Sequence, residues 1–284
     1  MKKTNSLILK LTAVLALILI VFISSCKKDT KSSIIPTPPI NNISYSLGCE
    51  MLPASEYAKI EQAKPITLKT LPASVNLVVP PVGNQGSEGS CVAFGTTYAG
   101  RSINWQAAHP GVWSNTANVF SPEYVYNQIK INASCGSGSY VTSGLNLLKT
   151  KGACKLSTMP YVDGQCSLAP NSAQNTDAAN YKIAGYSTLP PVAATIKTYL
   201  AAGKPVIVAG PVNNAYMYLA NNAILGNFVS PSLGGHCYCV VGYDDAKGAF
   251  KFMNSWGPNW ASSGFGYISY NSIATWWTEV YVMN

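Results

Sequence analysis

The sequence predicts an α+β protein with two lobes, because helix signals dominate its first half and strand signals its second. The chain has 284 residues, of which 48% are hydrophobic and 11% are charged. That balance is typical of a folded protein and argues against a disordered one. A chain of this length can form one large domain or two small ones.

Four helices are expected, and each has a recognisable start or stop signal. The first begins at Ser90 or Cys91 and runs to about Ala108, because Pro110 restricts the residue before it to extended geometry. The second, at residues 121–131, opens with a capping serine followed by proline and glutamate. The other two, each closed by a glycine, are expected at residues 143–150 and 192–202.

Five short apolar runs in the second half are expected to be strands. They are residues 205–209, 237–243, 249–253, 265–269 and 280–283. Cys91 then belongs to a helical lobe, whereas His236 and Asn254 belong to a strand lobe. A cleft between the lobes would bring these three side chains together.

Cys91 is the expected nucleophile. It follows Gly89 and Ser90 and precedes an apolar helical run, so its thiol is expected at a helix N-terminus. A helix N-terminus and a nearby imidazolium both lower the pKa of a thiol, and the thiolate is the reactive form. The alternative is a buried, inert cysteine, but the Gly-Ser lead-in and the upstream Gln85 favour a reactive one.

His236 is the expected general base and acid. The only other histidine, His109, precedes Pro110 at a helix end and is expected on the surface. Asn254 follows His236 by 18 residues, about one hairpin, so its side-chain oxygen could orient the imidazole. Trp256 could shield that hydrogen bond from water, although simple core packing would also explain a tryptophan there.

Gln85 is the expected oxyanion donor. Its amide, together with the backbone N–H of Cys91, would stabilise a tetrahedral intermediate, and one such donor typically contributes about 10²–10³ in rate. A glutamine considered alone would be a surface loop residue.

These pieces, in this order, resemble the papain-like cysteine proteases. They are Gln85-Gly86-Ser87, Gly89-Ser90-Cys91, Gly234-Gly235-His236 and Asn254-Ser255-Trp256-Gly257. Cys91 and His236 are 145 residues apart, within the range of about 130–150 that is typical of the family. The resemblance covers about Leu71 to the C-terminus.

The resemblance implies a two-lobed fold with a helical N-terminal lobe, a β-barrel-like C-terminal lobe and the active site in the cleft between them. It also implies hydrolysis of peptide bonds in polypeptide substrates through a thiol acyl-enzyme, with no metal or other cofactor. By the same resemblance, Gly138, Tyr140 and Gly235 are expected to bind substrate.

Three departures from the family pattern stand out. Val92 replaces an aromatic residue under the nucleophile. Glu88 replaces a cysteine, which would leave Cys135 without its usual disulfide partner and could disfavour a thiolate at Cys91. Residues 136–139, Gly-Ser-Gly-Ser, replace the glycine pair that backs the substrate.

Cysteine pairing is expected because the N-terminal segment, described below, predicts export to an oxidising compartment. Seven cysteines follow Cys26, so at least one thiol should be free. The expected disulfide joins Cys154 and Cys166, on either side of a predicted loop, and a bond between Cys49 and Cys135 is a second possibility. The two remaining cysteines, Cys237 and Cys239, are expected to be buried thiols; they lack the second ligand pair of a zinc site.

The N-terminus is expected to direct the chain to a bacterial cell envelope. Residues 1–25 read as a lipoprotein signal peptide, with Cys26 as the lipidated residue. An ordinary secretory signal or a short anchor is the alternative. Residues 26–46 are expected to form a flexible tether, residues 47–70 a pre-domain arm, and residues 71–284 the peptidase domain. The 44 residues between Cys26 and Leu71 are few for an inhibitory pro-segment of this family.

The charge distribution argues against a nucleic-acid partner. The net charge is +8, but six of the 19 basic residues lie in the first 31 positions, and the body has no basic cluster. The expected function is that of a lipid-anchored cysteine peptidase, an endopeptidase and a monomer, on the outer membrane or cell surface. The alternatives are a catalytically silent binding domain and a thiol cell-wall peptide hydrolase or transpeptidase.

Overall fold

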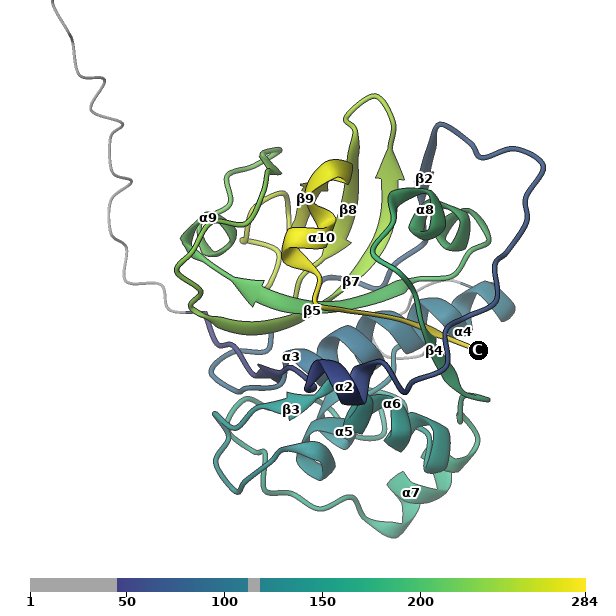
Figure 1. Cartoon of the computed structure of the whole chain (residues 1–284). Helices are drawn as coiled ribbons and strands as arrows, with labels where there is room; N and C mark the ends of the chain where they lie inside the picture. The colour runs from purple at the N-terminus through teal and green to yellow at the C-terminus, as the bar shows by residue number, and fades with distance from the viewer. Residues whose placement is uncertain (1–44, 112–117) are drawn as a thin grey trace, which may run out of the picture. The chain divides into compact units, whose positions relative to one another are not determined.

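The computed structural model describes residues 45–111 and 118–284 (Figure 1). The expected signal peptide, Cys26 and nearly all of the tether lie outside these residues. From Ser44 to Asn284 the chain forms one compact unit. Within the described residues, no helix is both long and apolar enough to span a membrane.

An eight-stranded sheet organises the C-terminal lobe. Its strands in spatial order are β4 (Tyr186–Thr188), β10 (Glu279–Met283), β5 (Val206–Val212), β7 (Gly234–Asp244), β8 (Ala249–Met253), β9 (Phe265–Ser269) and β6 (Ile224–Leu225), with β2 (Ser74–Asn76) also paired to β7. All neighbours are antiparallel except β6 and β9. All five predicted strands are present, and among the described residues no pairing joins β4 to β6, so the sheet is open.

The first predicted helix is present as one continuous run from 91 to 108. It consists of α3 (Cys91–Ala93), the π-helical η1 (Phe94–Arg101) and α4 (Ser102–Ala108). The chain leaves it at His109, whose φ of −133° and ψ of 69° are outside the helical range, as expected before Pro110. Gly95 lies in the π-helical stretch, where a Cβ atom would come 2.7 Å from the Cys237 sulfur. Only glycine therefore permits this close approach of the helix to β7.

The other predicted helices are also present. In α5 (Pro122–Ile129), the Ser121 hydroxyl accepts a hydrogen bond from the backbone N–H of Tyr124 at 3.1 Å, as a cap should. Both α6 (Val141–Thr150) and α8 (Ala193–Ala201) are followed by a glycine with positive φ. The remaining short elements are β1 (Cys49–Glu50), α2 (Ala54–Tyr57), β3 (Ser139–Tyr140), α7 (Ser172–Ala179), α9 (Asn214–Met217), η2 (Tyr270–Ser272) and α10 (Ile273–Trp276).

Two main hydrophobic clusters correspond to the two lobes. One lies within the C-terminal lobe and is rich in aromatic side chains, among them Tyr216, Phe252 and Trp276. The other fills the helical lobe and includes Cys91 on the helix and Cys237 on β7. Since the second cluster uses side chains of both lobes, the helix that begins at Cys91 is packed directly against the sheet.

The predicted disulfide between Cys154 and Cys166 is wrong. Cys166 is bonded to Cys135, with their Cα atoms 5.4 Å apart, so Cys49 cannot pair with Cys135 either. Cys154 is a buried free thiol that faces the helical core, whereas Cys135 and Cys166 lie on two adjoining loops. The expected buried thiols Cys237 and Cys239 are free and buried.

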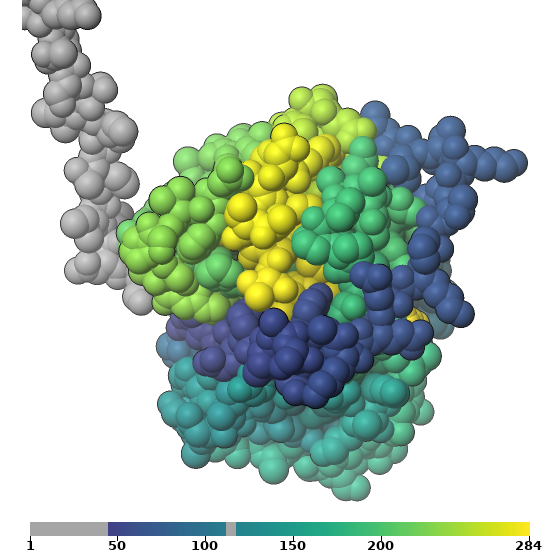
Figure 2. Space-filling model, in the orientation of Figure 1, coloured from purple at the N-terminus to yellow at the C-terminus, as the bar shows by residue number. Residues whose placement is uncertain are grey.

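Residues 45–52, which we call the strap, lie along the junction of the two lobes (Figure 2). The strap contains β1, which pairs in parallel with β3. The segment that follows it contains α2 and reaches the far end of the sheet, where Gln62 forms a bridge with Thr188. The first part of residues 47–70, expected to be an arm without strong pattern, is thus packed against the body of the protein, whereas residues 67–70 are exposed.

Candidate active site

Cys91 is the first residue of α3 and is fully buried. The fold brings its sulfur next to the main chain of Cys237, the residue directly after His236 on β7. Three backbone N–H groups, those of Cys237, Val92 and Gly48, form hydrogen bonds that favour the thiolate. The structure thus places the predicted nucleophile at a helix N-terminus, beside the strand that carries the predicted base.

His236 and Asn254 are in direct contact. The ring nitrogen Nε2 lies 2.8 Å from Asn254 Oδ1, which also accepts the backbone N–H of Ser255 at 2.8 Å. Because Oδ1 can only accept, Nε2 must carry the hydrogen. In the neutral ring Nδ1 is therefore an unprotonated acceptor, and it is buried without a hydrogen-bond partner among the described residues. This leaves Nδ1 free to take a proton.

Aromatic rings enclose this pair. Trp256 stacks on the imidazole with ring centroids 4.6 Å apart, and Tyr216 meets its edge at 5.7 Å. Trp256 therefore has the covering position expected of it, and its presence excludes water from one face of His236.

Burial governs the ionisation of both reactive groups. It raises the pKa of Cys91 well above the usual thiol range; the neighbouring Cys237 raises it further, and the three backbone hydrogen bonds offset only part of the rise. Burial also lowers the pKa of His236 to about 4, although the hydrogen bond with Asn254 opposes this. Burial therefore opposes a charge on either group while the site is closed, and the ion pair between Cys91 and His236 stays a prediction for the open site.

Gln85 lies close to Cys91 but its amide is already engaged. Its Nε2 donates to the backbone oxygens of Glu88 at 2.9 Å and of Ser46 at 3.1 Å. Its Oε1 accepts from the Ser255 hydroxyl at 2.6 Å, which fixes the orientation of the amide. The donor predicted for an oxyanion thus holds a carbonyl of the strap.

The strap contacts both lobes around this site. Tyr45 stacks on Trp256 at 4.5 Å, and the Trp256 indole N–H donates to the Ser46 oxygen at 3.2 Å. The Gly48 oxygen accepts from the backbone N–H of Ser139 at 2.9 Å. Further along, the backbone N–H of Leu52 donates to the Glu279 carboxylate on β10.

The three predicted substrate-binding residues all lie against the strap. A Cβ atom on Gly235 would come 2.0 Å from the Cys49 oxygen, and one on Gly138 would come 3.1 Å from the Gly48 oxygen. Tyr140 is paired with Glu50 in the β1–β3 register. Where these residues are expected to bind substrate, the chain's own N-terminal segment is bound instead.

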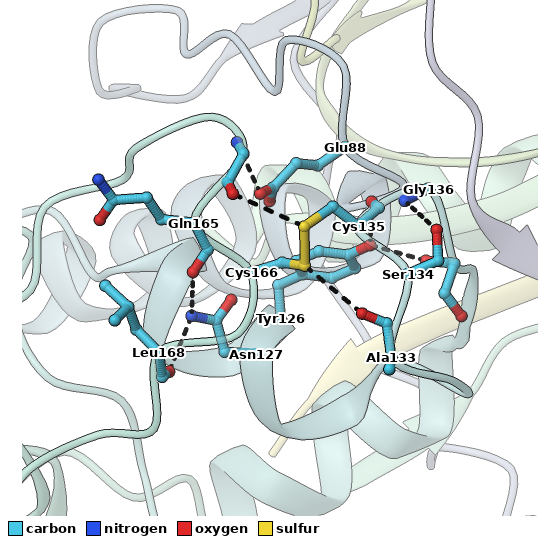
Figure 3. Close-up of a disulfide and its surroundings, with 12 residues drawn as sticks. Glu88, Tyr126, Asn127, Ala133, Ser134, Cys135, Gly136, Gln165, Cys166 and Leu168 are labelled. Carbon is cyan, nitrogen blue, oxygen red and sulfur yellow. Dashed lines mark hydrogen bonds between the residues drawn. A yellow bond between two sulfur atoms is a disulfide. The ribbon is translucent and has the colours of Figure 1, made fainter.

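The departures at Val92 and Glu88 are accommodated differently. Val92 is fully buried and packs against Gly144 of α6. Glu88 is fully buried as well, hydrogen-bonded to Tyr161 and Gly164 beside the Cys135–Cys166 disulfide (Figure 3). Its carboxyl oxygen and the two sulfurs are close enough for a metal site, but the disulfide removes both thiolates, so this group cannot hold a metal ion.

Sequence reasoning missed four residues of the site. Ser255 orients Gln85, Tyr161 holds the loop before Cys91, and Tyr45 and Ser46 cover Trp256 and Gln85. Ser255 stands next to Asn254 and could have been found from that position. The others come from loops whose sequence carries no periodic signal.

Comparison with known proteins agrees with this geometry. The family described as papain family cysteine protease matches residues 71–281. The chain is 27% identical over 203 residues to cathepsin B-like CP3 of Giardia intestinalis, a match that covers 66% of this chain and 63% of the relative. It is 29% identical over 189 residues to chymopapain of Carica papaya, covering 66% and 51%. The chain thus spans less than two thirds of either relative.

Among solved structures, xylellain, a cysteine protease from Xylella fastidiosa, superposes with a TM-score of 0.68. The sequences are 24% identical, and the match covers 84% of this chain and 95% of the other. The likeness supports the fold, and the predicted two-lobed α+β fold is confirmed.

Proposed function

Because this chain belongs to the papain family of cysteine proteases, we propose that it is a cysteine peptidase that hydrolyses peptide bonds through a thiol acyl-enzyme. One observation carries the proposal: a buried cysteine at a helix N-terminus lies beside the strand of a histidine whose Nε2 is held by Asn254 and whose Nδ1 is free. In this role Cys91 is the nucleophile, His236 the base and acid, and Gln85 the oxyanion donor.

The proposed reaction has two stages. First, His236 Nδ1 takes the Cys91 proton, and the sulfur attacks the carbonyl carbon of the scissile peptide bond. The Gln85 amide and the Cys91 backbone N–H stabilise the oxyanion, and His236 returns the proton to the leaving amine. Water, deprotonated by His236, then attacks the thioester, and the thiol reforms as the acid product leaves. Asn254 keeps the imidazole in the required orientation throughout.

The closed strap suggests that this peptidase is latent as folded. The carbonyl of Ser46 takes the amide hydrogen that an oxyanion would need, and Cys49 and Gly48 lie over the thiol and its neighbours. Substrate can bind only after these contacts are released. Polypeptide substrates and cleavage within the chain, rather than from an end, are part of the proposal.

We would test the activity by incubating casein, under mild reductant, with the parent and with a strap-displaced form, Gly48→Val, in which the added side chain would clash with the Gly89 oxygen. Cys91→Ala in each form is the matched control, because it removes only the sulfur. Cleavage that depends on Cys91 supports a peptidase. A folded protein whose strap is displaced and whose Cys91 is alkylated, but which leaves casein intact, contradicts the proposal. The remaining candidates are then a binding domain and a cell-wall enzyme, which peptidoglycan digestion distinguishes.

The location of the peptidase is a separate proposal. A basic start, an apolar stretch and Cys26 together support export and lipid attachment to a bacterial envelope, with the outer membrane or cell surface as the expected site. Residues 27–44 would then join the lipid to the strap.

A further inference from the structure

Glu88 belongs to the loop that leads to Cys91, and its side chain points beneath that loop. Its side chain is fully buried, with one carboxyl oxygen accepting the backbone N–H of Gly164 at 2.9 Å. The other oxygen lies 3.0 Å from the Tyr161 hydroxyl. A buried carboxyl group with no basic partner is costly when charged, so its hydrogen bonds need a full account.

The Tyr161 hydroxyl has more acceptors than it can serve. It lies 2.7 Å from the Gln85 backbone oxygen, which only accepts, and 2.9 Å from the Ser90 hydroxyl, which can donate or accept. Tyrosine has a single hydrogen to donate. If Glu88 were ionised, its oxygen and the Gln85 carbonyl would compete for that hydrogen.

A proton on Glu88 satisfies every group at once. Glu88 then donates to the Tyr161 oxygen, Tyr161 donates to the Gln85 carbonyl, and the Ser90 hydroxyl donates to the second lone pair of Tyr161. The oxygen of Glu88 without the proton still accepts from Gly164. When Glu88 is protonated, each hydrogen bond in this cluster has one donor and one acceptor; when it is ionised, one pair consists of two acceptors.

The surroundings of Glu88 favour the neutral form. Burial raises its pKa, and the carboxylates of Glu123 and Asp163 raise it further, while the hydrogen bonds with Tyr161 and Gly164 oppose this. Glu123 lies on α5 and Asp163 on the loop of Tyr161. The two disulfide sulfurs lie within 4.8 Å of a Glu88 oxygen and carry no charge. Tyr126 of α5 is neutral, because burial raises its pKa.

This cluster fixes two residues of the active-site loop. Tyr161 holds the backbone of Gln85, whose amide is the proposed oxyanion donor, and the side chain of Ser90, which directly precedes the nucleophile. Asp163 holds the same loop at Ser87, through both the backbone N–H and the hydroxyl. Loosening Tyr161 would therefore release the loop at both ends while Ser87 stays attached.

We propose that Glu88 is a positioning residue that acts as a protonated carboxylic acid: by donating its hydrogen to Tyr161, it directs the tyrosine hydrogen to Gln85 and holds the oxyanion loop in register with Cys91. The proposal rests on the proposed peptidase function. Its consequence is that the loop is ordered while Glu88 keeps its proton and loosens as the pH rises through the pKa of that group.

The first test does not depend on activity. The difference infrared spectrum between the protein and Glu88→Gln at neutral pH should contain the band of one protonated carboxyl group. Hydrogen exchange of residues 85–91 should accelerate at alkaline pH beyond its intrinsic rate in the parent, but not in Glu88→Gln, because glutamine keeps both a donor and an acceptor at every pH. Carboxylate bands in the difference spectrum, or equal exchange in the two proteins, would overturn the proposal.

The second test is kinetic. In the strap-displaced peptidase, Glu88→Ala and Tyr161→Phe should each lower kcat by about tenfold or more with little change in KM, and the double variant should lose no more than one of them. Glu88→Gln should recover kcat and lack the alkaline loss of kcat that Glu88 causes. Glu123→Gln leaves Glu88 and Tyr161 in place, so it should keep that loss, moved to lower pH because the Glu123 carboxylate raises the pKa of Glu88.

The two tests separate the two proposals. Absence of peptidase activity in the strap-displaced protein contradicts the proposed function, and the infrared and exchange results still decide the state of Glu88. Activity with the same pH profile in Glu88→Gln and the parent contradicts the positioning role alone.

Discussion

The surroundings of His236 differ greatly from those of an imidazole in water. It is fully buried, enclosed by the rings of Trp256 and Tyr216, and among the described residues its one hydrogen-bond partner is Asn254. Enclosure of this kind opposes the imidazolium, and its pKa falls to about 4 from an ordinary value of about 6.5. Folding therefore stabilises the neutral ring.

This predicts an acid-dependent loss of stability. The folded protein binds the His236 proton less tightly than the unfolded chain, so the contribution is fully present above about pH 6.5 and is lost as the pH falls to about 4, by about 3 kcal/mol. Urea unfolding of the parent and of His236→Gln across this pH range should isolate the contribution of His236 to the free energy of unfolding. His109→Gln, at an exposed site, is the control; a parent and His236→Gln with parallel curves would contradict the prediction.

At this scale the sequence identified the residues whose chemistry is carried by local motifs. Cys91, His236, Asn254 and Gln85 each stand in a short pattern with a chemical reason, and the structure brings them to one place. Their catalytic roles stay predictions. Tyr161 was not identified, because its contacts with the loop before Cys91 span more than seventy residues of chain and leave no mark in either segment.

In the proposed peptidase, the strap controls whether substrate can reach the active site. It is held by backbone hydrogen bonds, by the ring of Tyr45, and by the side chains of Leu47, Cys49 and Met51, which pack into the hydrophobic clusters of the two lobes. It also passes so close to the loop before Cys91 that a Cβ atom on Gly48 would come 2.1 Å from the Gly89 oxygen. A larger residue at 48 thus cannot be accommodated while the strap is bound.

We expect Gly48→Val to displace the strap. A steric clash of this size costs about 1–3 kcal/mol, which corresponds to an open fraction about 10- to 100-fold larger. Alkylation of Cys91 by iodoacetamide and casein hydrolysis should rise together, with Cys91→Ala as the background. Gly226→Val, where a Cβ meets nothing within 4 Å, is the matched control. Alkylation at the parent rate in Gly48→Val would show that the strap is no barrier.

The disulfide between Cys135 and Cys166 joins the loop beneath the strap to the loop of Tyr161. The two cysteines are 31 residues apart, and closing a loop of that length stabilises a folded chain by about 3–4 kcal/mol. Reductant should therefore lower the free energy of unfolding of the parent by about this amount, and Cys135→Ala should no longer respond to reductant. A response that persists in Cys135→Ala would favour the pairing of Cys166 with Cys154.

Regular elements were predictable where capping or alternation marks them, and the strap was not. Ser121 and Pro122 mark the start of α5, and apolar runs mark the strands. β1 has only two residues and exists because β3, ninety residues later, pairs with it. The π-helical stretch is likewise set by packing of Gly95 on β7, which no local pattern encodes.

Over the whole molecule, the order of helices before strands was enough to predict two lobes. The sequence could not show that the arm before residue 71 belongs to the same compact unit. If lipid attachment at Cys26 and inhibition by the strap both hold, one stretch of chain would carry the anchor and close the active site.

Lipid attachment itself can be tested at Cys26. In a bacterial host fed an alkyne fatty acid, the parent should carry the label and sediment with membranes, whereas Cys26→Ala should carry no label. Cys49→Ala is the control, because that thiol is buried in the strap. Label on Cys26→Ala equal to that on the parent would contradict lipidation at this residue.

If both proposals hold, one cut should free and activate the peptidase. Residues 67–72 are exposed and join the strap segment to the body, and β2, just after them, stays paired with β7. Cleavage at a protease site introduced there would leave the anchor and strap on one fragment and Cys91, His236 and Asn254 on the other. We expect the second fragment to leave the membrane and to hydrolyse casein faster than the uncut protein. Release without faster hydrolysis would mean that the cut strap stays bound. Adding Gly48→Val should then displace it and raise the rate of casein hydrolysis. If the rate does not rise, inhibition by the strap is contradicted.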